Sequence, residues 1–373
     1  MRIEAEHGLS SFAGSGIIAR LVLKEVQLKN PRPLRVPTRC VAVIGAGVSG
    51  LVSARTLQDH EFSVTVFEKS HGPGGRTATR RADPGLSFDH GAQYFTAAES
   101  HFKAFVDECV QQGIVAEWTG LIVKIDGTKV ESKTHHPVRY VGVPAMTAMA
   151  SHLADELTIH RSARIVELTR GENGWELTDA NGRTYRDYDY VIVSLPAPQS
   201  TLLLGDHALA QEVSAIPMTP CWAVLAAFES RIDVPWDGAF IHGSPLAWVA
   251  RNSSKPGRNP AIDCWVLHAS PDWSCATLEH PREAVAVELL SAFAQAVSLQ
   301  LPPTIHVDAH RWLHSATPMP LDRLVLFDPD SGIAVCGDWL AGGRVEGAFR
   351  SGVAAAENIL RYVGIPANDS IRE

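Results

Sequence analysis

The clearest chemical signal in the sequence is the loop GAGVSG, residues 45–50. It follows a short β-branched run and precedes apolar residues at helical spacing, so it should join a strand to a helix. Gly45 would permit the tight turn, Gly47 would let the backbone approach a diphosphate, and Gly50 would let helix and strand pack closely. Free N–H groups at the start of that helix would bind the diphosphate. The loop therefore predicts a dinucleotide site.

An acidic residue at the expected distance supports this interpretation. Glu68 ends a second strand-like run, residues 64–67. An acid about 20 residues after such a loop accepts hydrogen bonds from ribose hydroxyls. The two runs and the helix between them predict a βαβ unit. A glycine-rich turn in an unrelated α/β protein is the alternative, and the agreement of all these features favours the dinucleotide.

Later segments carry residues suited to a flat, charged ligand. In GPGGRT, residues 72–77, consecutive glycines give a backbone that can lie against a ring system, and Arg76 offers a planar fork for phosphate. FDHGAQYF, residues 88–95, follows. Near the C-terminus Asp338 ends an apolar run, and a helix is expected to begin near Val345. The N-terminus of that helix would stabilise negative charge.

These motifs together resemble a known family. GGR after a βαβ unit resembles the flavin amine oxidase superfamily, and GGRTATRR paired with FDHGAQYFT resembles renalase, most closely its bacterial members. SLPAPQ at 194–199, the segments 248–258 and 265–269, and CGDW with GRVEGA near the C-terminus are similar to the same proteins. The resemblance runs from about residue 40 to about residue 362.

The resemblance implies an α/β fold of the amine oxidase and hydroxybenzoate hydroxylase kind. A Rossmann-like FAD-binding domain would be interleaved with a substrate domain built of a mixed sheet and helices. The expected divisions are a flexible N-terminal extension, three FAD-binding segments and two substrate segments, in the chain order 1–38 extension, 39–95 FAD, 96–158 substrate, 159–200 FAD, 201–325 substrate and 326–365 FAD. Residues 96–158 are predicted to be mostly helical, and Asn181-Gly182 predicts a hairpin turn.

The resemblance also implies an FAD-dependent oxidase. Its substrates would be the 1,2- and 1,6-dihydro isomers of NAD(P)H, oxidised to NAD(P)+ by hydride transfer to the flavin, with O2 reduced to H2O2. Such a substrate already donates hydride, so orientation and exclusion of water would matter more than a strong base. Covalent attachment would need a suitably placed cysteine. Cys336 is expected to pack on its strand, which favours non-covalent FAD.

Three residues are the predicted catalytic set: Tyr94 as a pocket wall that can bond the carboxamide, His268 and Arg251. His268 is interpreted as a substrate-facing donor, with a satisfied core histidine as the alternative. Arg251 belongs to a basic loop with Lys255 and Arg258, for which a solvated loop is the alternative. Trp312 is expected to pack in the core rather than to form an aromatic wall. The predicted cofactor ligands are Gly45, Gly47, Ser49, Gly50, Glu68, Lys69, Gly75, Arg76, Gln93, Tyr94, Asp338, Val345 and Glu346.

Composition limits the remaining possibilities. The chain has 373 residues and a formal net charge of -8, which argues against generic nucleic-acid binding by a basic face. Its six cysteines form no CxxC pair and no zinc spacing, and His135-His136 has no partners at metal spacing, so no metal site is expected. No apolar run is long enough to span a bilayer. A cytoplasmic protein with no membrane partner is the expectation.

Two other classes of function stay open. One is an amine oxidase or a related desaturase acting on an amine or a lipid-like substrate. The other is a flavin-binding or scaffolding protein without catalysis. Reduction of the flavin by a primary amine would favour the first, and a flavin that no donor reduces would favour the second.

Overall fold

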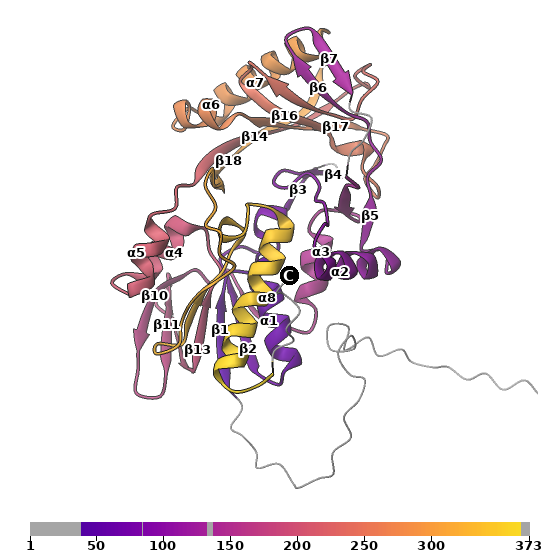
Figure 1. The fold of residues 1–373 in the computed structure, drawn as a ribbon. Coiled ribbons are helices and arrows are strands. Elements are labelled where there is room, and N and C mark those ends of the chain that lie inside the picture. The colour runs from indigo at the N-terminus through magenta and orange to yellow at the C-terminus, as the bar shows by residue number, and fades with distance from the viewer. Residues whose placement is uncertain (1–38, 84, 133–136, 367–373) are drawn as a thin grey trace, which may run out of the picture.

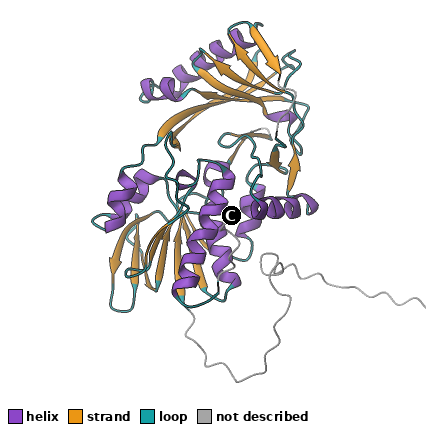
Figure 2. Ribbon diagram, viewed as in Figure 1, coloured by secondary structure: helices purple, strands orange, loops and turns teal. Residues whose placement is uncertain are grey.

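The computed structural model describes residues 39–83, 85–132 and 137–366. Two large sheets dominate it, one in the lower and one in the upper half of Figure 1. Helices lie beside both sheets, and loops connect the two halves (Figure 2). The predicted extension 1–38 and the pair His135-His136 lie outside the described residues. The fold is a mixed α/β fold with a Rossmann-like domain, as predicted.

The lower sheet has six strands in the order β19-β20-β13-β1-β2-β9. Their bounds are Leu326–Asp328, Ile333–Val335, Tyr190–Val193, Cys40–Ile44, Ser63–Glu68 and Thr158–Arg161. The central strand β1 pairs in parallel with both β13 and β2, whereas the edge strand β19 is antiparallel to its neighbour. β1 is buried along Val41–Ile44, which is why it reads as a continuous apolar run.

Two helices pack together beside this sheet: α1 (Val48–Asp59) and α8 (Val345–Tyr362). They lie side by side in Figure 1. Small residues permit the close approach, since a Cβ at Gly352 would lie 2.3 Å from the carbonyl oxygen of Ser49. A Cβ at Gly50 would lie 2.1 Å from the carbonyl oxygen of Gly45, so Gly50 has the packing role expected of it. The fingerprint loop is thereby closely packed between β1 and α1.

The upper sheet has seven strands in the order β18-β14-β17-β16-β15-β6-β7. Their bounds are Thr304–Ala316, Thr219–Phe228, Asp263–Ala269, Leu246–Arg251, Gly238–His242, Ile122–Asp126 and Lys129–Ser132. Its neighbours pair antiparallel except β15 and β6. Helices α6 (Pro271–Ala276) and α7 (Arg282–Val297) lie along its outer side in Figure 1. The large side chains Trp222, Trp265 and Phe293 fill the core between sheet and helices.

The prediction that residues 96–158 are mostly helical is wrong for their middle part. Helices α2 (Ser100–Gln111) and α3 (Ala148–Ala154) flank four strands, which are β5 (Val115–Glu117), β6, β7 and β8 (Tyr140–Gly142). β6 joins the upper sheet by pairing with β15, whose residues lie more than a hundred positions later. A local pattern cannot reveal such a pairing, because the partner strand supplies the burial.

Smaller elements complete the fold. Strands β10 (Ile165–Arg170), β11 (Trp175–Asp179) and β12 (Thr184–Tyr188) form a separate sheet, and the predicted Asn181-Gly182 hairpin turn joins the last two. Strands β3 (Thr79–Ala82) and β4 (Leu86–Asp89) form a hairpin, and the remaining helices are α4 (Ala197–Leu204) and α5 (Ala208–Ser214). In the described ranges no helix combines the length and the apolar character needed to cross a bilayer.

Candidate functional site

A cavity of about 1020 Å³ lies between the two sheets. Its lower wall is formed where β1, β2 and β13 end, and its upper wall takes residues from β14 to β18. Parallel sheets bind ligands at the carboxyl ends of their strands, which is where this lower wall lies. The cavity is large enough to take a sizeable ligand with a substrate beside it.

The lower wall contains an open cradle for a diphosphate. Gly47 is the N-cap of α1, and no side chain caps the helix there, so its first-turn N–H groups remain available. A Cβ at Gly47 would meet nothing within 4 Å, whereas a Cβ at Gly75 would lie 3.4 Å from the Cα of Gly47. Gly45, Gly47, Ser49 and Gly75 line the cavity together. This geometry fits an adenine dinucleotide diphosphate.

Glu68 lies at the end of β2, beside this cradle. Its carboxylate accepts hydrogen bonds from the backbone N–H of Ala46 at 2.8 Å and of Ser70 at 2.7 Å. The side chain is buried and lines the cavity, while the neighbouring Lys69 lines it from an exposed position. The two backbone bonds fix the carboxylate at the end of β2, where a ribose could bond its remaining lone pairs.

Arg76 and Asp338 both line the cavity and pair with each other. The guanidinium donates to both carboxylate oxygens, one of these bonds being 3.0 Å from Nη1 to Oδ2, and also to the carbonyl of Ser315 at 3.1 Å. The phosphate role expected of Arg76 and the ribityl role expected of Asp338 stay predictions. Both groups stand at the cavity with their polar atoms fixed.

The N-terminus of α8 also faces the cavity. Arg344, its N-cap, and Val345 line it, and no side chain caps the helix. Glu346 corrects the predicted cofactor set in one respect: its side chain bonds elsewhere, while a cofactor role for its backbone N–H in the first turn of α8 stays a prediction. Its carboxylate accepts from the backbone N–H of Ala98 at 2.8 Å and of Glu99 at 2.6 Å, so it anchors the chain before α2 and does not line the cavity.

A buried ionic cluster supports the loop that carries Gln93 and Tyr94. The carboxylate of Asp89 accepts from Lys255 at 3.2 Å and from Arg258 at 2.6 Å. Lys255 also donates to the side-chain oxygen of Gln93 at 3.1 Å. The basic loop is therefore neither solvated nor in contact with the cavity, and both interpretations of it were wrong. Gln93 lines the cavity from the top of this cluster.

Arg251 is the second correction. Its side chain is fully buried, lies 3.5 Å from a carboxylate oxygen of Asp263 and stacks over Trp265 at 4.8 Å from the ring centre. It does not line the cavity. The prediction that Arg251 contacts a substrate is wrong, because its carboxylate partner and its aromatic platform lie inside the upper half.

The upper wall of the cavity is aromatic. Tyr94 lies 5.6 Å from Trp248, ring centre to ring centre, and Phe240 lies 4.6 Å from Trp248. Trp312 donates its indole N–H to the carbonyl of His90 at 2.9 Å and lines the cavity. The expectation that Trp312 packs in the core rather than forming an aromatic wall is therefore wrong.

Histidines share this wall with the aromatic rings. The rings of His90 and His310 lie 4.8 Å apart, and the Nε2 of His268 donates to the carbonyl of His90 at 3.0 Å. Burial lowers the pKa of all three, to about 3 for His90 and about 4 for His268 and His310. They are neutral at physiological pH and supply hydrogen bonds rather than charge. The substrate role expected of His268 stays a prediction, although His268 lines the cavity.

Sequence reasoning missed Arg80, His90 and His310 as residues of the site. One signal was available in β18, where His306, His310 and His314 recur at even positions and share one face of the strand. Nothing local shows that this face turns toward a cavity, since its neighbours come from the hairpin β3–β4 near the N-terminal third of the chain. Among the described residues no cluster of His, Cys, Asp or Glu is suited to a metal ion.

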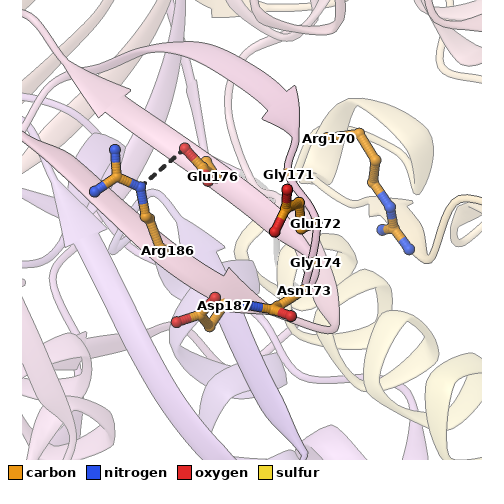
Figure 3. A pocket seen from close by; sticks show the side chains of 8 residues that line it. All are labelled: Arg170, Gly171, Glu172, Asn173, Gly174, Glu176, Arg186 and Asp187. Carbon is orange, nitrogen blue, oxygen red and sulfur yellow. Dashed lines mark hydrogen bonds and ion pairs between the residues drawn. The ribbon is translucent and has the colours of Figure 1, made fainter.

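A second, shallower cavity of about 700 Å³ lies on the small sheet β10–β12 (Figure 3). Charged side chains line it, and Arg186 donates to Glu176 at 3.1 Å, the bond drawn as a dashed line. Arg170 points away from this pair in the figure and stacks over Trp175. The cavity shares no residue with the cradle, and most of its charged side chains are exposed, so the large cavity is the candidate site.

Comparisons with known families agree with this site. Residues 43–109 match the NAD(P)-binding Rossmann-like domain, and residues 131–360 match the flavin containing amine oxidoreductase family. The second match covers more than half of the chain. The chain therefore belongs to the flavin containing amine oxidoreductase family, which makes it an oxidoreductase with a flavin cofactor.

Individual relatives place the chain only broadly within this family. It is 45% identical over 67 residues to mitochondrial protoporphyrinogen oxidase of Nicotiana tabacum, which covers 18% of this chain and 13% of that protein. Coproporphyrinogen III oxidase of Staphylococcus aureus is 36% identical over 86 residues, 22% and 18% of the two chains. The matched stretches span less than a fifth of these curated relatives.

Solved structures share the fold over most of the chain. Cyclohexylamine oxidase of Brevibacterium oxydans superposes with a TM-score of 0.71 at 14% identity, covering 88% of this chain and 100% of the other. Putrescine oxidase bound to putrescine gives a TM-score of 0.61 at 15% identity over 87% and 99%. At such identities the likeness shows the fold alone.

Proposed function

We propose that the protein is an FAD-dependent oxidase of renalase type. It would oxidise the 1,2- and 1,6-dihydro isomers of NAD(P)H, so that one dihydronicotinamide, one O2 and one proton yield NAD(P)+ and H2O2. Bound FAD would supply the two-electron acceptor for this reaction. Glu68, the α1 N-terminus, Arg76, Asp338 and the α8 N-terminus are the groups that would hold it.

One observation carries the choice of substrate: the aromatic wall faces the cavity without a carboxylate. Of the described residues that line the cavity, only Glu68 and Asp338 are acidic. Glu68 is bonded to backbone amides at the cradle, and Asp338 is paired with Arg76. A cationic amine would find no counter-charge beside the aromatic rings. A dihydronicotinamide is uncharged at its ring, and its phosphates suit the arginines of the wall.

The residues of the wall suit the task of orientation. Tyr94, Trp248 and Trp312 offer aromatic faces against which a nicotinamide ring can stack. Neutral histidines supply hydrogen bonds without repelling a product that carries positive charge on its ring. No strong base is required, because the substrate loses a hydride and not a proton.

Attachment of the flavin is proposed to be non-covalent. Cys336 is fully buried and absent from the cavity wall, and burial raises its pKa to about 12. Cys221 lines the cavity, and burial raises its pKa to about 12 as well. Neither thiol would be a thiolate at neutral pH, and the thiolate is the form that attacks a flavin.

An amine oxidase is the second candidate. It is favoured by the three aromatic side chains Tyr94, Trp248 and Phe240, which lie together at the cavity. A neutral amine could lie between such rings. Amines are mostly protonated in solution. The described residues of this wall include no carboxylate that could pair with a protonated amine, which argues against such a substrate.

The test is anaerobic mixing of the purified holoprotein with each dihydronicotinamide isomer, followed by the flavin spectrum. We expect fast bleaching by the 1,2- and 1,6-isomers and slow bleaching by ordinary NADH. Benzylamine and putrescine serve as amine controls. Bleaching by an amine alone would replace the proposal with the second candidate, and bleaching by no donor would leave a non-catalytic flavoprotein.

A further inference from the structure

The hairpin β3–β4 brings Arg80 to the aromatic wall. This arginine is not part of the cofactor cradle. Arg80 lines the cavity, is partly buried and donates from Nη2 to the Nδ1 of His310 at 3.2 Å. Two other arginines that line the cavity have carboxylate partners. Arg76 pairs with Asp338, and Arg311 lies 3.3 Å from Glu279.

Arg80 differs from them in its charge balance. Among the described residues no carboxylate lies within 4.0 Å of its guanidinium. Its hydrogen-bond partner His310 is neutral, and a neutral imidazole cannot balance a positive charge. A partly buried cation without a counter-ion is costly, since burial removes water that no opposite charge replaces. An anionic group entering the cavity would remove that cost.

The hydrogen bond also fixes how Arg80 can act. Because Nδ1 of His310 accepts from the guanidinium, the proton of His310 is on Nε2. The guanidinium is therefore oriented by a ring that itself packs 4.5 Å from Trp312, centre to centre. A planar fork held in this way suits a phosphate, which it can bind with two parallel N–H bonds.

We propose that Arg80 and His310 form the subsite for a phosphate group of the nucleotide substrate. This deepens the proposed function and rests on it, because it assigns the substrate class as phosphorylated dihydronicotinamides and not the free riboside. The aromatic rings would take the nicotinamide, and Arg80 would select for the phosphate. Arg80 is a binding residue of the substrate and contributes nothing to holding FAD.

The experiment compares the holoprotein with its R80Q and R80K variants, and with R81Q as the matched control. Arg81 is the next residue on the same strand, is exposed and does not line the cavity. The probes are the 1,6-dihydro forms of NAD and of nicotinamide riboside, which lacks phosphate. Half-saturating concentrations come from anaerobic flavin bleaching. Binding of ADP-ribose is measured separately, from the shift it causes in the oxidised flavin spectrum.

We expect R80Q to raise the half-saturating concentration of the dinucleotide roughly 10- to 100-fold, as loss of a charge-assisted bond predicts. The riboside should be unaffected, R80K should fall between, and R81Q should behave as the parent. ADP-ribose should bind the parent and bind R80Q at least about tenfold more weakly. Equal affinities of parent and R80Q for ADP-ribose would overturn the subsite, as would loss of FAD from both Arg80 variants.

The two proposals fail separately. If no isomer bleaches the flavin but ADP-ribose binding still depends on Arg80, the oxidase proposal fails and the phosphate subsite stands. If the isomers bleach the flavin and R80Q does not discriminate dinucleotide from riboside, the oxidase proposal stands and the subsite is refuted. R80K covers the case in which R80Q does not fold.

Discussion

Replacing Asp89 by Asn should destabilise the protein more than any conservative change on its surface. Burial alone would raise the pKa of Asp89, but the adjacent Lys255 and Arg258 outweigh it and lower that pKa to about 2. The carboxylate is therefore charged inside the protein. It also accepts from the hydroxyl of Thr79 at 2.7 Å and from the backbone N–H of Met146 at 3.1 Å.

The expected cost follows from what D89N leaves behind. An asparagine keeps the shape but not the charge, so two buried cations lose their partner. Removing one side of a buried ion pair typically costs about 3–5 kcal/mol. A loss of that size should lower the melting temperature by about 10 °C. Because Asp89 begins the loop that carries Gln93 and Tyr94, flavin content should fall as well.

The assay is thermal unfolding of the holoprotein followed by circular dichroism and by release of flavin fluorescence. D126N is the matched control, since Asp126 is exposed and lies 4.0 Å from Lys124, and such surface pairs contribute little. The double variant D89N/K255M should recover part of the loss, because it removes one of the stranded charges. A D89N protein that melts within about 2 °C of the parent would refute the reasoning.

Two further predictions concern acid and the cradle. The pKa values of His90, His268 and His310 are lowered in the folded state, so the unfolded chain binds protons first as the pH falls below about 6.5. The free energy of unfolding, measured by urea unfolding at each pH, should therefore drop by several kcal/mol in total between about pH 6.5 and 4. A free energy of unfolding that stays constant across this window would contradict the prediction. Gly47→Val should purify without flavin and melt at the temperature of the flavin-free parent, because its Cβ has open space where the diphosphate would lie. Gly50→Val should fail to fold, since a Cβ there would lie 2.1 Å from a carbonyl oxygen. A yellow Gly47→Val protein would refute the cradle.

The sequence predicts those residues of the site that lie close to one another in the chain. GAGVSG, the two flanking strands and Glu68 lie within about thirty residues, and each residue type is dictated by local geometry. The structure brings Gly45, Gly47 and Glu68 to one cavity wall. All three residues belong to one βαβ unit, and the local geometry of that unit specifies their types.

The substrate side depends on contacts between distant segments, which is why sequence reasoning failed there. Arg251 was chosen for its type in a basic loop, but Asp263 from the adjoining strand β17 lies 3.5 Å away and holds it inside. Trp312 was expected to pack in the core rather than to form an aromatic wall. Its indole instead bonds the carbonyl of His90, more than two hundred residues earlier, and places the ring at the cavity.

The backbone carbonyl of His90 links the loop after β4 to the upper wall of the cavity. It accepts from His268 on β17 at 3.0 Å and from Trp312 on β18 at 2.9 Å, two neighbours of β14 in the upper sheet. The same loop is anchored below by the backbone N–H of Ala92, which donates to the carbonyl of Arg76 at 2.8 Å. One short segment thus bonds both the flavin cradle and the substrate wall. Oxidation of a hydride donor depends mainly on the distance and angle between two rings, and this segment fixes the walls against which both would lie.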